Sequence, residues 1–116
     1  ASWCGPCVEE MPDMEQLYRS MTDRPFEMIA ISADIDYNNV KAFYKQHELT
    51  FPDHNDPGQG IARDYHVTGF PETFLIDANG YVRKHYIGPQ KWMNPPVFAV
   101  IEKILKDQDA NKSASN

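Results

Sequence analysis

Apolar side chains follow two different patterns along the chain. Between residues 11 and 21 they recur every three or four positions, which predicts a helix with one buried face. Residues 26–33 are almost continuously apolar instead, as in a strand that is covered on both faces. The same two criteria predict the remaining elements, which are helices after Asp36, over 60–65 and over 97–105, and strands over 73–76 and 81–87.

The order of these elements predicts an α/β fold, in which a mixed sheet is covered by helices on both faces. Asn79-Gly80 favours a type I′ turn, so the last two strands should form an antiparallel hairpin. Residues 51–58 are polar and predict a loop. We expect one domain over residues 1–106 and a disordered polar tail over 107–116.

Charge narrows the classes of partner. The 116-residue chain carries a formal net charge of −6, and its eleven Lys and Arg residues are scattered. A nucleic acid or an anionic membrane surface needs a basic patch, so neither is expected as a partner. The sequence also lacks an apolar run of the roughly 18 residues that a spanning helix requires.

The two cysteines, Cys4 and Cys7, are only three positions apart. A disulfide that closes so short a loop contributes about 2 kcal/mol at most, so structural stapling explains the pair poorly. A metal site would need further ligands, but the four histidines lack ligand spacing and no second Cys-x-x-Cys is present. The spacing therefore favours redox chemistry, with metal binding and a structural disulfide as the alternatives.

The position of the pair on a predicted helix assigns the two roles. Cys4 falls at the exposed helix N-terminus, where unpaired N–H groups and the helix dipole stabilise a thiolate. Cys7 lies one turn inside, within reach to resolve a mixed disulfide. Glu10 projects near the turn of Cys7 and is a candidate general base. The alternative for Glu10 is a negative charge that only favours the helix N-terminus.

The motif WCGPC at residues 3–7 resembles the signature of the thioredoxin family, and Pro12 matches the proline within that family's active-site helix. Residues 67–77 resemble the family's second active-site segment, in which Pro71 would be a cis-proline. The resemblance implies a thioredoxin fold. Its candidate substrate-binding residues are Trp3, Gly5, Pro6, Phe70, Pro71 and Glu72. Trp3 is alternatively a packing residue, and Glu72 one that only borders the site.

Within that superfamily the chain is more similar to the TlpA/ResA/DsbE group. Cys4-x-x-Cys7-x-x-Glu10-x-Pro12 resembles the ResA branch, and Pro71-Glu72-Thr73 resembles the DsbE (CcmG) segment of cytochrome c maturation. This implies an extracytoplasmic, periplasmic or membrane-anchored, reductase of protein disulfides. A membrane thiol reductase would donate its electrons, and it would act as a monomer without metal or organic cofactor.

Two alternatives stay open. One is a general cytoplasmic thioredoxin, since Gly-Pro between the cysteines is the dipeptide of general thioredoxins and argues against specialisation for haem proteins. The other is a copper or zinc carrier that uses Cys4 and Cys7 on a thioredoxin scaffold. In the family fold, the strand that leads into the cysteine motif lies between the strands expected at 26–33 and 73–76. The chain begins after that strand, so we expect unpaired inner edges and poor independent folding.

Overall fold

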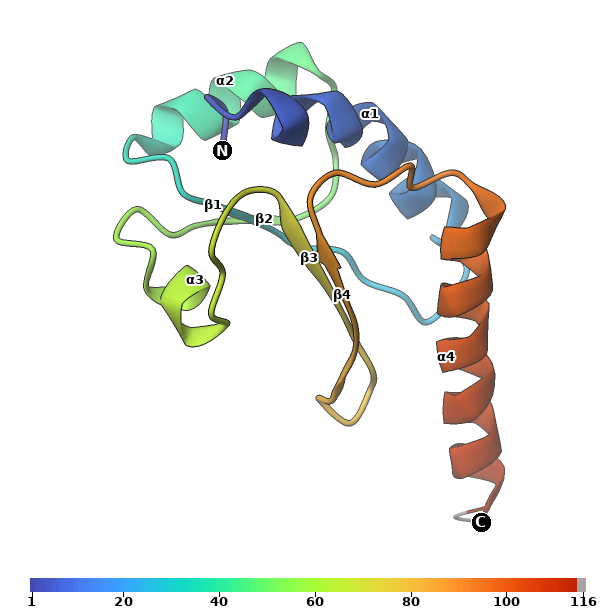
Figure 1. Ribbon diagram of the computed structural model, residues 1–116. Helices are drawn as coiled ribbons and strands as arrows, with labels where there is room; N and C mark the ends of the chain where they lie inside the picture. Colours follow the sequence, from blue (N-terminus) through green and yellow to red (C-terminus); the bar gives the residue numbers. More distant parts are fainter. Residues whose placement is uncertain (115–116) are drawn as a thin grey trace.

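A computed structural model describes residues 1–114, with side chains described through residue 110. Residues 1–114 form four helices and four strands, and Figure 1 shows their arrangement. In chain order they are α1 (Gly5–Ser20), β1 (Ala30–Ser32), α2 (Tyr37–Gln46), β2 (Asp53–Asn55), α3 (Gly60–Asp64), β3 (Glu72–Ile76), β4 (Val82–Ile87) and α4 (Pro95–Ala114).

The strands form two separate pairs. β1 runs parallel to β2, with Ala30 opposite Asp53, and β3 runs antiparallel to β4, with Glu72 opposite Ile87. Among residues 1–114 no strand joins the two pairs, so β1 and β3 each leave one edge without a strand partner. The predicted mixed sheet is thus present as a parallel half and an antiparallel half, without the strand that the family fold places between them.

Local signals explain where the helices begin. Pro6 occupies the first turn of α1, where its missing N–H costs no hydrogen bond. Asp36 precedes α2, and its Oδ1 accepts the Asn38 N–H at 2.9 Å, as the sequence predicts. Asp56 precedes α3 and accepts two N–H groups of that helix.

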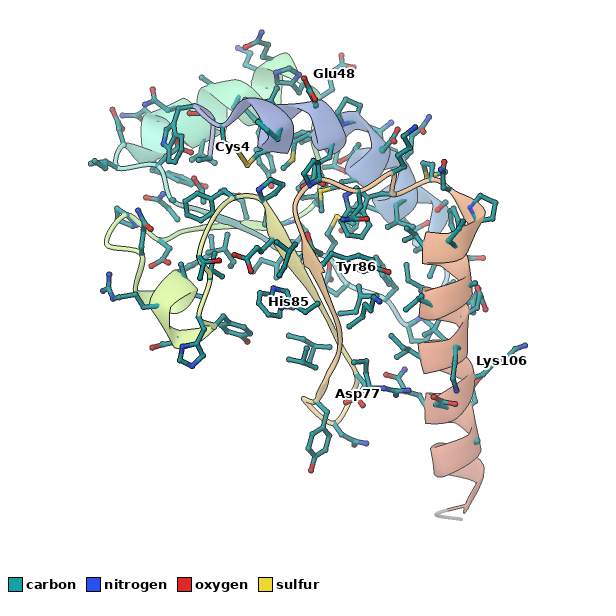
Figure 2. The ribbon with its side chains drawn as sticks, in the orientation of Figure 1. Cys4, Glu48, Asp77, His85, Tyr86 and Lys106 are labelled. Carbon is teal, nitrogen blue, oxygen red and sulfur yellow. A yellow bond between two sulfur atoms is a disulfide. The ribbon has the colours of Figure 1, made fainter. Side chains whose placement is uncertain are left out.

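The main core lies between α1, α4 and one face of the β3–β4 hairpin. Its buried members are Leu17, Met21, Trp92, Val97, Ile101 and Leu105. Leu75 and Tyr86 pack against this cluster from the hairpin. Figure 2 shows the neighbouring residues His85 and Tyr86 on opposite sides of β4.

The opposite face of the hairpin meets α3. The rings of Phe74 and His85 stack there with centroids 4.2 Å apart, and Tyr65 at the end of α3 contacts Phe74. Because α3 lies on this face and α1 and α4 on the other, the expectation of helices on both faces is confirmed.

Two local predictions differ from the structure. The predicted loop 51–58 contains β2, whose polar residues pair with β1 through the backbone. The hairpin turn is not type I′, since Gly80 has a φ of +89° and Asn79 does not adopt positive φ. The turn instead closes when the Gly80 N–H donates to the Asp77 carbonyl at 3.0 Å, with Ala78 and Asn79 between them.

The end of the last helix also differs from the prediction. Helix α4 continues to Ala114, past the boundary expected at residue 106 and into the predicted disordered tail. Within this extension Asp107 forms an ion pair with Arg83 of β4 at 2.5 Å. Arg83 lies far from Asp107 in the sequence, so the composition of the tail did not indicate this ion pair. Residues 115–116 of the predicted tail lie outside the described residues.

Candidate active site

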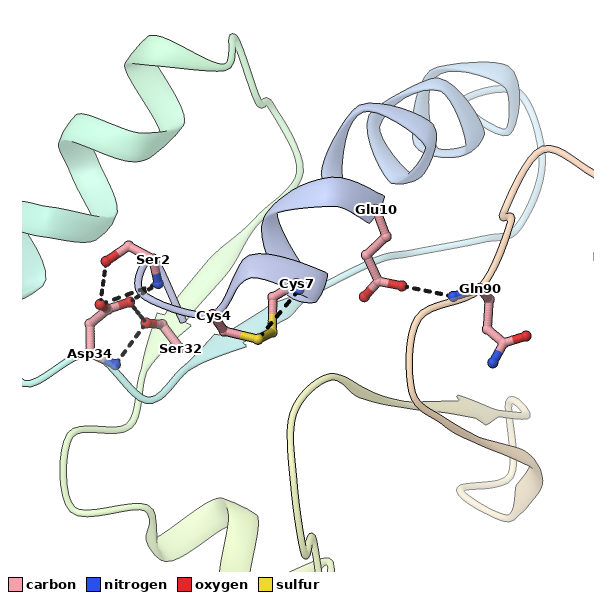
Figure 3. The surroundings of a disulfide bond; sticks show 7 residues. All are labelled: Ser2, Cys4, Cys7, Glu10, Ser32, Asp34 and Gln90. Atoms are coloured by element: carbon pink, nitrogen blue, oxygen red, sulfur yellow. Dashed lines mark hydrogen bonds between the residues drawn. A yellow bond between two sulfur atoms is a disulfide. The ribbon is translucent and has the colours of Figure 1, made fainter.

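Cys4 and Cys7 form a disulfide at the start of α1, with their Cα atoms 5.3 Å apart. Cys4 is the N-cap residue, and its Sγ accepts the Cys7 backbone N–H at 3.3 Å, as Figure 3 shows. The sulfur of Cys4 is therefore at the N–H end of the helix. An N–H group in this position would stabilise a thiolate once the disulfide is reduced.

The disulfide is more enclosed than the sequence predicts. Cys4 is 8% exposed and Cys7 is 3% exposed, so Cys7 is the more buried of the two, as predicted. The predicted exposure of Cys4 is wrong for this oxidised form, because its Sγ is turned back onto the first turn of the helix. On its inner side Cys7 borders a cavity of about 60 Å³, together with Val8 and Ile31.

The loop before β3 lies beside the cysteine motif. The rings of Trp3 and Phe70 meet edge to face with centroids 5.9 Å apart. The Phe70–Pro71 peptide bond is cis, which confirms the prediction. Trp3 is 65% exposed, and Gly5 and Pro6 are exposed as well. The structure thus brings the two sequence-predicted segments together and leaves apolar surface open next to the disulfide.

Glu10 is a buried carboxylate, 5% exposed. Its Oε2 accepts the Trp92 indole N–H at 2.8 Å and the Gln90 backbone N–H at 3.2 Å. Burial raises the pKa of Glu10, and these two donors oppose the shift without cancelling it. Such a carboxylate can exchange a proton closer to neutral pH than an exposed one. A charge that only favours the helix N-terminus would not require this burial.

Glu72 forms its hydrogen bonds with the loop before β3 and with His85 of β4. Its Oε2 accepts the N–H groups of Thr68 at 2.8 Å and Gly69 at 3.1 Å, and its Oε1 lies 2.7 Å from His85 Nε2. Burial alone would raise the pKa of Glu72, but the Gly69 and Thr68 N–H groups and His85 hold it below its usual value. These bonds make Glu72 a clamp on the loop before Pro71, while its contact with a substrate stays a prediction.

A third carboxylate, which the sequence analysis did not single out, holds the segment that leads into the motif. Asp34 is 3% exposed and accepts the Ser2 N–H at 3.0 Å, the Ser2 hydroxyl at 2.5 Å and the Ser32 hydroxyl at 2.5 Å (Figure 3). Burial alone would raise the pKa of Asp34, but the donors from Ser2 and Ser32 hold it below its usual value. No periodicity or motif marks Asp34, because its partner Ser2 is 32 residues away.

No set of three or more His, Cys, Asp or Glu side chains in the described part of the chain is arranged to hold a metal ion. None of the helices within residues 1–114 combines the length and the apolar character needed to cross a membrane.

Comparisons with known proteins agree with this site. The chain is 43% identical over 89 residues to the thiol-disulfide oxidoreductase ResA of Bacillus cereus, covering 77% of this chain and 51% of that protein. The chain thus spans about half the length of the curated relatives it matches. Among solved structures, a Chlorobium tepidum protein assigned as the thiol:disulfide interchange protein DsbE superposes with a TM-score of 0.82. It is 31% identical, over 90% of this chain and 74% of the other.

A Neisseria meningitidis protein assigned as a thioredoxin also superposes with a TM-score of 0.82. It is 23% identical, over 94% of this chain and 72% of the other, which establishes the shared thioredoxin-like fold. The model of the AhpC/TSA family matches residues 1–85, nearly three quarters of the chain. The chain therefore belongs to the AhpC/TSA family and has a thioredoxin-like fold.

Proposed function

We propose that this chain is a protein thiol–disulfide oxidoreductase that reduces protein disulfides outside the cytoplasm. The observation that carries the proposal is the Cys4–Cys7 disulfide at the start of α1, with Cys4 Sγ at the helix N–H groups. The buried Glu10 and the loop with cis Pro71 lie around it. The similarity to a protein named thiol-disulfide oxidoreductase supports the same chemistry.

The reaction would proceed in two exchanges. The Cys4 thiolate attacks one sulfur of a substrate disulfide, forms a mixed disulfide and releases the first substrate thiolate. Cys7 then loses its proton to Glu10 and attacks Cys4 Sγ, which releases the second substrate thiolate. The substrate gains two electrons and this chain keeps the Cys4–Cys7 disulfide. A dithiol of a membrane thiol reductase would take over that disulfide and restore both thiols.

The surface beside the disulfide suits an extended substrate segment. Trp3, Gly5 and Pro6 are exposed on the helix side, and Phe70 approaches Trp3 from the loop side. Pro71 carries no backbone N–H, so the loop can offer the Phe70 backbone to a substrate strand without a competing donor. We assign substrate contact to these five residues. Glu72 holds the same loop by accepting the N–H groups of Thr68 and Gly69.

The extracytoplasmic location and the membrane partner rest on resemblance. Residues 4–12 resemble the ResA branch, and residues 71–73 resemble the DsbE segment that serves cytochrome c maturation. Fractionation of cells that produce the protein from its complete gene tests the location. Recovery from the cytoplasm with general disulfide-reducing activity would favour a general thioredoxin instead.

Two single substitutions test the chemistry in the protein produced from its complete gene. We expect Cys4→Ser to abolish reduction of a protein disulfide such as that of insulin, because the attacking thiolate is lost. Cys7→Ser should accumulate a mixed disulfide on Cys4, visible by non-reducing electrophoresis and mass spectrometry. Trapping by the Cys4 variant would reverse the two roles. Stoichiometric Cu(I) or Zn(II) binding with little reduction by the unaltered protein would favour the metal carrier.

A further inference from the structure

Trp92 is a large residue held at the edge of the active site. It is 1% exposed and belongs to the core cluster between α1 and α4, where its indole meets Tyr86 edge to face at 5.2 Å. An indole N–H can only donate, and a buried donor without an acceptor is costly. The acceptor that Trp92 finds is Oε2 of Glu10, at 2.8 Å.

The two hydrogen bonds to Glu10 are placed unequally on its carboxylate. The Gln90 backbone N–H and the Trp92 indole both donate to Oε2, while Oε1 has no hydrogen-bond partner in the described part of the chain. Figure 3 shows the second oxygen on the Cys7 side of the carboxylate. The donors hold one oxygen away from the disulfide, and the free oxygen is the one that faces it.

From this arrangement we propose that Trp92 is a positioning residue, which holds Glu10 by one carboxylate oxygen and leaves the other to exchange a proton with the thiol of Cys7. The inference rests on the proposed thiol–disulfide exchange and gives it a specific support outside the cysteine motif. Trp92 touches neither the substrate nor the sulfur atoms in this scheme. Its contribution passes entirely through Glu10.

The charged and titratable surroundings of Glu10 are few. They are the thiols of Cys7 and Cys4 when reduced and the Tyr86 phenol beyond Trp92. Burial raises the pKa of Tyr86, so this phenol stays neutral below about pH 10. A transition on the acid side that depends on Glu10 can therefore be separated from these groups by substitution.

Replacing Trp92 by phenylalanine keeps an aromatic ring in the core and removes the N–H donor. Because that donor favours the ionised form, its loss raises the pKa of Glu10. Only ionised Glu10 accepts the Cys7 proton, so resolution of the mixed disulfide should weaken at a higher pH than in the unaltered protein. In a plot of the resolution rate against pH, the rate falls on the acid side, and we call this fall the acid limb. We expect the acid limb to move up by about one to two pH units, the size expected for one hydrogen bond to a charged group.

The experiment measures single-turnover resolution against pH in the protein produced from its complete gene. Trp92→Phe should shift the acid limb, and the same change in a Glu10→Gln background should shift nothing further. Val97→Ala is the matched control, because Val97 lies in the same core cluster and makes no hydrogen bond to Glu10 within the described residues. It should lower stability and leave the limb in place. A limb that Trp92→Phe does not move, although Glu10→Gln alters it, would overturn this inference alone.

A second measurement needs no core substitution. In the reduced, unaltered protein the indole N–H resonance of Trp92 should follow the titration of Glu10, and the transition should vanish in Glu10→Gln. Trp3 is the internal control, since its exposed indole makes no hydrogen bond to Glu10 in the described structure. An indole resonance of Trp92 that does not respond would refute the inference. Unchanged resolution in Glu10→Gln would instead refute the proposed role of Glu10, while the cysteine variants test the exchange independently.

Discussion

Replacing Glu72 should loosen the loop that presents Pro71 without changing the redox pair itself. The side chain of Glu72 is 3% exposed and makes three contacts, to the N–H groups of Thr68 and Gly69 and to His85. Hydrogen bonds to a charged group contribute about 1.5–3 kcal/mol each. Because water can replace the acceptor at the exposed loop amides, we expect Glu72→Ala to lower the free energy of unfolding by about 2–4 kcal/mol in total.

Glu72→Gln keeps the size of the side chain and one acceptor oxygen but removes the negative charge, so it measures the effect of the charge alone. The amide oxygen still accepts from the loop N–H groups, so a loss of about 1–2 kcal/mol is expected. The pKa of Glu72 is lowered in the folded protein, so its stabilisation is complete above the unfolded carboxyl pKa of about 4.3. That contribution is lost as the pH falls through the lower folded pKa. The stability difference between the two proteins should therefore be full at pH 7 and shrink below about pH 4.

The assay compares a protein disulfide with a small disulfide. A loosened loop should raise KM for the protein disulfide several-fold, while the rate of Cys4 with a small disulfide stays the same. Amide hydrogen exchange at Thr68 and Gly69 should accelerate in parallel. Glu102→Gln is the control, because it also removes one carboxylate charge but from an ion pair with Arg24. Equal KM values and equal exchange in Glu72→Gln and the unaltered protein would refute the clamp.

Three further predictions concern the same site. Glu10→Gln should lower the pKa of Cys4 and slow resolution near neutral pH, measured by thiolate absorbance and single-turnover kinetics; a change in thermal stability alone would reduce Glu10 to a helix-end charge. Asp34→Asn should cost about 1–3 kcal/mol in chemical denaturation and speed amide exchange at Ser2; unchanged exchange there would contradict the anchoring role. The 116-residue chain alone should melt non-cooperatively or associate, because β1 and β3 each leave an open edge; a sharp two-state melt of the monomer would disprove this.

The sequence predicted those parts of the fold that depend on nearby residues. The periodic apolar positions of 11–21 and the cap at Asp36 are local signals, and α1 and α2 follow them. The strand β2 was missed because its three residues are polar and its pairing with β1 depends on backbone hydrogen bonds between distant segments. The extension of α4 was missed for a related reason, since Asp107 pairs with Arg83 of another element.

The site shows the same division. The cysteine motif and the cis-proline segment are short and local, so the sequence alone identified both. The burial of Cys4 and the contacts of Glu10 depend on how distant segments pack, and Trp92 lies 82 residues from Glu10. The ring of Trp92 lies in the core, as its apolar character favours, but nothing local in the sequence indicates where its N–H group donates.

Three carboxylates with little exposure bind the segments that form the site, and each binds a different segment. Asp34 holds the residues before Cys4, Glu72 holds the loop before Pro71, and Glu10 is held by the connection between β4 and α4. Each carboxylate binds backbone or indole N–H groups, which restrain geometry more narrowly than apolar packing does. The Cys-Gly-Pro-Cys motif supplies the reacting sulfur atoms, but their surroundings come from these tertiary contacts. The same four residues grafted onto a helix without them would retain a disulfide and lose the control of loop position and proton transfer.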